Sequence, residues 1–165
     1  MPRRKVNSAP EGSPEAAREK CLRLLAVRAR SAWELRDRLR RSGFASDVAE
    51  GVLADLESAG LVDDLEFARS WIASRQASGR MGRHRLRWEL RRKGVADELI
   101  ERVVGETIDD GTEAEQALRL AQKRMKGGGN DARSLARVRR LLLGRGFGSD
   151  VVDTVIRRIS SGTEQ

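Results

Sequence analysis

The feature of this sequence that most constrains its fold is an internal repeat with a period of about 50 residues. The segments SAWELRDRLRRSGFASDV, HRLRWELRRKGVADEL and LARVRRLLLGRGFGSDV align on Gly43, Gly94 and Gly146, which lie 51 and 52 residues apart. Each segment has two apolar residues before the glycine at intervals of four, an apolar residue directly after it, and an acid four residues after it: Leu35, Leu39, Phe44 and Asp47; Leu86, Leu90, Val95 and Glu98; Val138, Leu142, Phe147 and Asp150. Such a period predicts an array of repeated structural units.

The pattern within one repeat predicts helices. Two apolar residues four apart mark one face of a helix. The glycine fits the left-handed residue that ends a helix in a Schellman motif, and the acid falls in the first turn of the next helix, where the helix dipole favours negative charge. Each period has room for one further helix before this pair. We therefore expect an all-α protein, an elongated tandem array of three three-helix repeats.

The opening helix of each repeat is predicted from capping residues and apolar spacing. The first follows Pro14 and the second begins at Asp63, which forms a capping box with Glu66; Thr112 and Glu115 repeat that pattern in the third, and Ser31 and Glu34 show it before the first middle helix. The predicted buried faces are Leu22, Leu25 and Ala29; Phe67, Trp71 and Ser74; and Ala117, Leu118 and Ala121.

The predicted boundaries follow from these elements. A disordered basic tail covers residues 1–13, the repeats cover 14–61, 62–107 and 108–160, and a second disordered tail covers 161–165. Both tails are too polar to offset the entropy of ordering. The GGGN segment at 127–130 is expected to form a flexible loop inside the third repeat.

The residues that usually carry catalysis or metal binding are sparse. The one cysteine, Cys21, excludes a disulfide framework, and its helical spacing from Ala17 indicates a buried thiol. The one histidine, His84, stands among arginines without companions at metal-ligand spacing, and the adjacent Asp63 and Asp64 point apart at a helix start. No phosphate-binding or nucleophile motif is present. We expect a protein that is not an enzyme and that holds no cofactor or metal.

Location follows from what the sequence lacks. No apolar run approaches the roughly 18 residues of a membrane span, and the first residues are basic without an apolar signal core. We expect a monomer in a bacterial-type cytosol, with an organelle as the alternative.

Charge is the remaining functional signal. The chain has 33 Lys and Arg against 25 Asp and Glu, a net charge of +8, which points to a polyanionic partner or one with an acidic face. The middle helices hold the surplus: residues 80–93 have seven basic residues and one acid, and residues 133–145 have five arginines and no acid. The third helices of the first two repeats are acidic instead.

A helical wheel of residues 83–93 separates a core face from a basic face. Leu86 and Leu90 point inward, and Trp88 points outward among basic side chains. Such a face could bind a partner by stacking and cation–π contact, or it could pack against a neighbouring repeat. The candidate contacts for a partner or nucleic acid are Arg83, Arg85, Trp88, Arg91, Arg92 and Lys93; Arg36, Arg40 and Arg41 in the first repeat; and Arg137 and Arg140 in the third.

Residues 61–95 resemble the central signature of the RecX family. The matching pieces are Asp63-Asp64, Phe67-Ala68, the run from Trp71 to Arg75, Gly82, Arg85-Leu86, Glu89-Leu90 and Lys93-Gly94. The resemblance implies a curved array of three-helix repeats that binds RecA and its filament on single-stranded DNA. It also implies suppression of RecA ATP hydrolysis, strand exchange and co-protease activity. The GGGN segment departs from the family pattern in the third repeat.

Two other function classes compete with the one that this resemblance implies. Residues 31–62 imitate a winged helix-turn-helix, but the helix that would enter the major groove carries four acids and no Lys or Arg between Ser46 and Gly60. DNA phosphates would repel it. A general single-strand-binding protein remains open, because the basic middle helices would serve that function as well.

Overall fold

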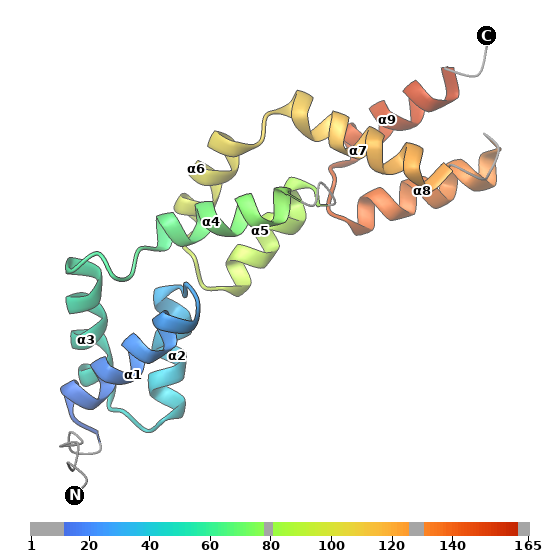
Figure 1. The fold of residues 1–165 in the computed structure, drawn as a ribbon. Helices are drawn as coiled ribbons and strands as arrows, with labels where there is room; N and C mark the ends of the chain where they lie inside the picture. Colours follow the sequence, from blue (N-terminus) through green and yellow to red (C-terminus); the bar gives the residue numbers. More distant parts are fainter. Residues whose placement is uncertain (1–11, 78–80, 126–130, 162–165) are drawn as a thin grey trace, which may run out of the picture. The chain divides into compact units, whose positions relative to one another are not determined.

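The computed structural model describes residues 12–77, 81–125 and 131–161, which form nine helices and no strand (Figure 1). The helices are α1 Pro14–Val27, α2 Ala32–Arg41, α3 Ser46–Ser58, α4 Asp64–Gln76, α5 Arg83–Arg92, α6 Asp97–Thr107, α7 Asp110–Met125, α8 Ala132–Gly144 and α9 Ser149–Ser161. The predicted all-α class with three helices in each of three repeats is confirmed. None of these helices is long and apolar enough to cross a membrane.

The predicted start of the C-terminal tail can be compared with the structure, whereas the predicted GGGN loop cannot. Helix α9 extends to Ser161, one residue into the predicted C-terminal tail. The GGGN segment lies outside the described residues.

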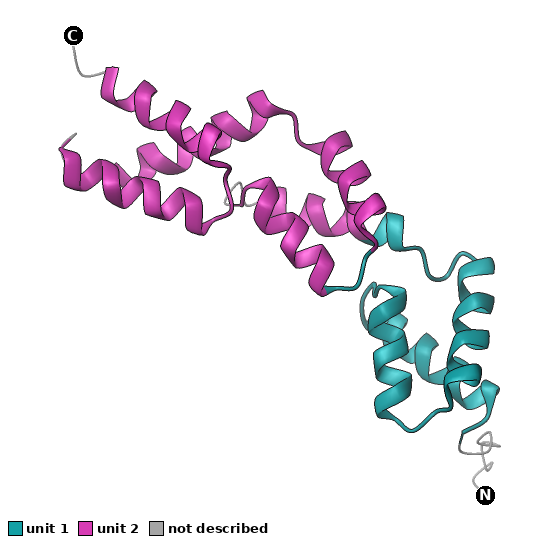
Figure 2. Ribbon diagram, turned by 180° about the vertical axis from the view of Figure 1, so that it is seen from behind, with its two compact units in different colours: residues 1–67, 93–95 teal, residues 68–92, 96–165 magenta. Residues whose placement is uncertain are grey.

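The chain divides into two compact units, shown in Figure 2. Unit 1 contains residues 1–67 together with 93–95, and unit 2 contains residues 68–92 and 96–165. The boundary therefore passes through α4 and around the end of α5.

The glycine turns have the predicted Schellman geometry. Gly43, Gly94 and Gly146 have φ values of 84°, 74° and 82°, in the left-handed region that glycine adopts without strain. The Phe44 N–H donates to the Leu39 carbonyl at 3.2 Å, and the Phe147 N–H donates to the Leu142 carbonyl at 3.2 Å. These bonds satisfy carbonyls that the helix end would otherwise leave without a partner.

In unit 1, α1 packs on α2 and α3 around a core that includes Leu35, Leu39 and Leu56. The buried face of α1 is Ala17 and Cys21, so the predicted buried thiol is confirmed. The predicted face is wrong for Leu22, which is 39% exposed, and for Ala29, which lies after the helix ends, whereas the predicted Leu25 is partly buried and packs against this core. Leu22 follows Cys21 directly, which turns its side chain about 100° away from the buried stripe.

The buried apolar side chains of α4 are Phe67, as predicted, together with Ala68 and Ile72. Trp71 is half-buried, and the prediction that Ser74 faces the core is wrong because Ser74 is exposed. Helix α7 packs against α8 and α9, with the predicted Ala117 and Ala121 fully buried.

The helix starts confirm two capping predictions and correct one. The Asp63 carboxylate accepts from the Glu66 N–H at 3.0 Å, and the Ser31 hydroxyl accepts from the Glu34 N–H at 3.2 Å. Thr112 does not cap α7: the Asp109 carboxylate accepts both the N–H and the hydroxyl of Thr112, each at 2.7 Å. Asp109 serves as the cap because its carboxylate reaches both donors of Thr112 in the first turn of α7.

Candidate functional site

The outward face of α5 is exposed as predicted. Leu86 and Leu90 are both 0% exposed and fix the helix on the core of unit 2, whereas Trp88 is 43% exposed. Arg85 and Arg92 lie on the same exposed side as Trp88. The burial of two leucines four residues apart therefore sets which residues α5 presents to a partner.

Trp88 lies between two arginines. The guanidinium carbon of Arg85 is 4.4 Å from the centroid of the indole ring, and that of Arg92 is 4.7 Å from it. Arg85 precedes Trp88 by three residues and Arg92 follows it by four, so they approach the ring from opposite directions along the helix. We call Arg85, Trp88 and Arg92 the arginine–tryptophan sandwich.

Glu89 joins this sandwich to α4. Its carboxylate accepts from Arg85 Nε at 3.3 Å, from Arg75 Nε at 3.1 Å and from Trp71 Nε1 at 3.1 Å. Arg75 in turn stacks over Trp71, 4.5 Å from the ring centroid. Glu89 is only 11% exposed, and its single carboxylate is shared by two arginines.

The four-residue spacing of Arg85 and Glu89 fits an ion pair within one helix, but the part that α4 plays could not be predicted in that way. The spacing of Trp71 and Arg75, four residues apart on a helix, could have indicated their stacking. Their contact with Glu89, 14 to 18 residues further along the chain, depends on how α4 and α5 pack.

An ion pair between middle and third helices recurs in each repeat. Arg36 contacts Glu50 at 2.5 Å, Arg87 contacts Glu101 at 2.8 Å, and Arg139 contacts Asp153 at 2.5 Å, always 14 residues apart. This pairing explains why basic middle helices alternate with acidic third helices. Exposed pairs of this kind contribute about 0.2–1 kcal/mol each, so their main effect is to neutralise charge.

Two of the three arginines proposed for the outward face of α5, Arg85 and Arg91, are paired with carboxylates. Arg91 contacts Asp97 at 2.6 Å and also lies 3.9 Å from Glu101, and Arg85 contacts Glu89. The turn after α5 returns the chain so that the first turn of α6 meets the last turn of α5. In the described part of the chain Arg92 contacts no carboxylate, and its contact is the Trp88 ring.

The candidate arginines of the other two middle helices, α2 and α8, also differ in whether they have a carboxylate partner. Arg40 and Arg41 of α2 share the Asp37 carboxylate at 2.9 and 2.8 Å. On α8, Arg137 donates to the Ser134 hydroxyl at 2.8 Å and Arg140 to the Ala136 carbonyl at 3.5 Å. Among the described residues, no carboxylate lies within ion-pair distance of Arg137 or Arg140, whereas Asp37 pairs with both Arg40 and Arg41.

Arg83, another candidate contact, belongs to a buried structural junction within unit 2. Glu113 of α7 is 1% exposed and accepts the Arg83 N–H at 2.8 Å and the Arg83 Nε, while Arg83 Nη2 also reaches Asp110 at 2.6 Å. In addition, the Gly82 N–H donates to the Arg145 carbonyl at 3.0 Å, and the His84 N–H donates to the Gly146 carbonyl at 3.1 Å. The start of α5 is thereby joined to the end of α8.

An equivalent junction lies within unit 1. The Asp64 carboxylate accepts the Ala32 N–H at 2.8 Å, and the Ser31 hydroxyl donates to the Lys93 carbonyl at 2.5 Å. Asp64 and Glu113 each lie four residues before a buried alanine of an opening helix, and Ala32 and Arg83 are equivalent residues of the middle helices. The sequence repeat therefore encodes its own junctions, in which an acid caps a middle helix.

Lys93 is engaged in the unit 1 junction as well. Its ammonium group lies 2.7 Å from the Glu34 carboxylate, which also accepts two hydrogen bonds from Arg28 at 2.9 and 3.0 Å. Burial alone raises the pKa of Glu34, but the hydrogen bonds from Arg28 and Lys93 outweigh it and lower the pKa from 4.5 to about 2. Lys93 therefore has a structural role.

This shift predicts a pH-dependent contribution to stability. Because the pKa of Glu34 in the folded state lies below its ordinary value, the stabilisation is present above about pH 4.5 and is lost as the pH falls towards 2. We expect Glu34→Gln to lower the free energy of unfolding by about 3 kcal/mol at neutral pH. In urea titrations the gap between variant and wild type should narrow on acidification; a gap independent of pH would contradict this assignment.

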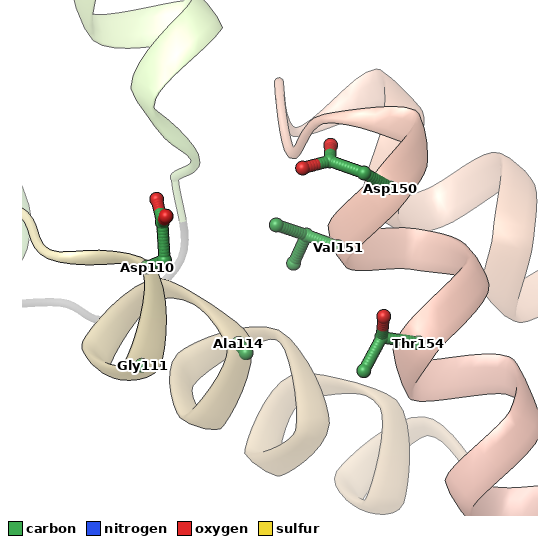
Figure 3. A pocket seen from close by; sticks show the side chains of 6 residues that line it. All are labelled: Asp110, Gly111, Ala114, Asp150, Val151 and Thr154. Atoms are coloured by element: carbon green, nitrogen blue, oxygen red, sulfur yellow. The ribbon is translucent and has the colours of Figure 1, made fainter.

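A pocket of about 300 Å³ lies between α7 and α9 and is lined by Asp110, Gly111, Ala114, Asp150, Val151 and Thr154 (Figure 3). The carboxylates of Asp110 and Asp150 stand on either side of its end near the N-termini of the two helices. Asp110 is paired with Arg83. The pocket presents negative charge, so it does not suit the polyanionic ligand that the net charge of the chain favours.

Comparison with known proteins places this geometry in a family. Models of the first, second and third three-helix domains of RecX match residues 17–56, 63–104 and 112–156. Regulatory protein RecX of Amycolatopsis mediterranei (strain U-32) is 41% identical over 150 residues, which cover 90% of this chain and 85% of that protein. Its counterpart in Mycobacterium tuberculosis (strain ATCC 25618 / H37Rv) is 36% identical over 158 residues, 92% of this chain and 90% of that protein.

Solved structures agree at the level of the fold. A crystal structure of RecX from Lactobacillus salivarius superposes with a TM-score of 0.82 at 22% identity and covers 90% of this chain and 97% of that chain. A second crystal structure of regulatory protein RecX gives a TM-score of 0.77 at 24% identity. With three matching domains and relatives similar over most of their length, this chain belongs to the RecX family of regulatory proteins.

Proposed function

We propose that this protein regulates homologous recombination and the SOS response by binding RecA and the RecA filament on single-stranded DNA. Binding would inhibit RecA ATP hydrolysis, strand exchange and co-protease activity. The observation that carries the proposal is the match of all three family domains in one chain. This function requires only binding, and it assigns the protein to the bacterial cytosol, where RecA acts.

The distribution of charge supports a filament as the target. A RecA filament on DNA combines protein with a polyanion, and this chain has a net charge of +8. We propose Arg85, Trp88 and Arg92 as the first contact, because Arg92 has no ion pair among the described residues and Arg85 shares the Glu89 carboxylate with Arg75. We propose Arg137 and Arg140 as the second contact, because neither has an ion pair in the described part of the chain. Arg36, Arg40, Arg41 and Arg91 are placed behind them because carboxylates already pair with them.

The helix-turn-helix alternative has no comparable support. Helix α3, which would occupy the major groove, contains Asp47, Glu50, Asp55 and Glu57 and no basic residue. The residues after Gly60 lead into α4 rather than into a hairpin wing. A general single-strand-binding protein is the remaining alternative, since exposed arginines would serve it equally well.

The proposal is tested by adding the purified protein to RecA on single-stranded DNA and following ATP hydrolysis. We expect hydrolysis and strand exchange to slow at substoichiometric to stoichiometric ratios to RecA. Inhibition should persist when the DNA is fully covered by RecA beforehand, which competition for free DNA alone would not achieve. No inhibition and no filament binding at protein excess would reject the proposal.

A further inference from the structure

The arginine–tryptophan sandwich on α5 departs from a simple base-stacking platform. Proteins that stack bases offer a free aromatic face. Here guanidinium groups approach the Trp88 ring from both directions, at 4.4 and 4.7 Å from its centroid. A base that stacked on the indole would compete with these arginines for the ring, so the guanidinium groups are the first polar groups that a ligand meets there.

The indole restricts these guanidinium groups. A guanidinium stacked over a ring keeps its N–H donors in a plane beside the ring, and this planar fork matches the oxygens of a phosphate. An exposed arginine normally loses side-chain entropy when it binds, and prior stacking reduces that loss. Trp88 is therefore suited to hold Arg85 and Arg92 in a binding orientation.

Charge around the sandwich is not balanced. Glu89 is shared by Arg85, Arg75 and the Trp71 ring nitrogen, and Arg92 meets no carboxylate in the described ranges. The same unit carries Arg137 and Arg140 on α8 without a carboxylate partner among the described residues. A polymer with one negative charge in every monomer can form ion pairs with several of these arginines, whereas a single acidic side chain can pair with only one.

The sandwich is particular to the second repeat. The residues that correspond to Trp88 in the other two repeats are Asp37 and Arg140, so neither repeat can hold two arginines against an aromatic ring at this position. The α5 surface also contains no Asn or Gln that could read base edges. Both facts favour a single contact with the DNA backbone that does not depend on the base sequence.

We infer that the sandwich binds the phosphodiester backbone of single-stranded DNA and that Trp88 is a positioning residue that holds Arg85 and Arg92, rather than a platform for bases. This inference rests on the proposed function for the choice of single-stranded DNA, and it names the chemistry by which that DNA is held.

The test measures fluorescence anisotropy without RecA, over a range of NaCl concentrations. The probes are labelled oligo(dT), an abasic deoxyribose-phosphate strand of equal length, and a duplex. The proteins are wild type, Arg85→Gln/Arg92→Gln, Trp88→Leu, Trp88→Phe and the control Arg158→Gln, an exposed arginine at the end of α9. Circular dichroism confirms that each variant keeps its helicity.

We expect wild type to bind oligo(dT) and the abasic strand alike. Arg85→Gln/Arg92→Gln should weaken both by ~10-fold or more and reduce the logarithmic salt slope by ~0.7 for each lost phosphate. Trp88→Leu should weaken both probes by a few-fold, Trp88→Phe should restore part of that loss because it keeps a ring for the arginines, and Arg158→Gln should change little.

Three results would overturn the inference. Weak binding of the abasic strand, with Trp88→Leu abolishing the preference for oligo(dT), would show that Trp88 stacks bases. If the double variant had the same affinity and salt slope as Arg158→Gln, Arg85 and Arg92 would not contact the DNA. Preferential binding of the duplex would likewise contradict the assignment to single-stranded DNA. RecA inhibition by wild type is measured separately: its absence rejects the proposed function, whereas inhibition without binding to either single-stranded probe rejects only this inference.

Discussion

Replacing Gly146 by alanine should lower the free energy of unfolding by about 2–5 kcal/mol. The new methyl group would collide with neighbouring backbone atoms, and alanine would also be strained at the left-handed φ of this position. A Cβ at Gly146 would overlap the Cβ and the backbone nitrogen of Arg85. Neither atom can move without displacing the first turn of α5, since the neighbouring His84 N–H is bonded to the Gly146 carbonyl. Urea unfolding followed by circular dichroism measures the loss.

Gly43 provides a matched control for this substitution. It has nearly the same φ, 84° against 82°, and the same place in the repeat, but a Cβ there has nothing within 4 Å. Gly43→Ala should therefore cost only the left-handed strain, about 1–2 kcal/mol. Equal losses for the two variants would show that the junction at Gly146 yields easily, and the argument for close backbone packing would fail.

The repeat pattern was sufficient to predict most of the fold. Leucine pairs such as Leu86 and Leu90, followed by a glycine and an acid, gave the middle helices, their Schellman ends and the starts of the third helices. Local signals of this kind depend on residues three to five apart, which a helix brings together by itself. Opening helices were predicted less well, because the small residues Ala17 and Cys21 are poor markers of a buried face.

The candidate site was predicted only in part, for reasons of distance along the chain. The outward orientation of Trp88 followed from helix periodicity, and the spacing of Arg85 and Arg92 around it was already visible. The acids that pair with arginines could not be read in the same way, because Glu101 and Glu113 lie 14 and 30 residues from their partners. Only the packed structure distinguishes the paired arginines from Arg92.

This pairing changes which substitutions can test the surface. Reversing Arg91 to Glu would place a new carboxylate beside Asp97 and Glu101, and reversing Arg85 would place one beside Glu89. Such variants would lose stability through like-charge repulsion, so a loss of binding could not be interpreted. Neutral replacements of Arg85 and Arg92 avoid this difficulty.

The second large effect is expected at the buried acid of the unit 2 junction. Glu113→Gln should lower the free energy of unfolding by about 3 kcal/mol, because it removes the buried carboxylate that pairs with Arg83 and leaves the partly buried guanidinium with weaker compensation. Arg83 would keep only the exposed Asp110 as its anionic partner, with its guanidinium still 23% exposed at the start of α5. Denaturant unfolding at neutral pH and moderate salt gives the value.

Asp64→Asn at the equivalent position of unit 1 should be close to neutral. Asp64 meets no cation in its junction hydrogen bond; it accepts the Ala32 N–H, which an amide oxygen can also accept. Burial raises the pKa of Asp64, the Ala32 hydrogen bond opposes that rise, and the neighbouring Asp63 adds to it. Since the folded pKa lies above the ordinary value, ionisation of Asp64 costs stability as the pH rises, and asparagine removes this cost. Comparable losses for Glu113→Gln and Asp64→Asn would mean that both acids act only as helix caps. A loss confined to Glu113→Gln would show that one repeated junction uses a hydrogen bond in unit 1 and a buried charge pair in unit 2.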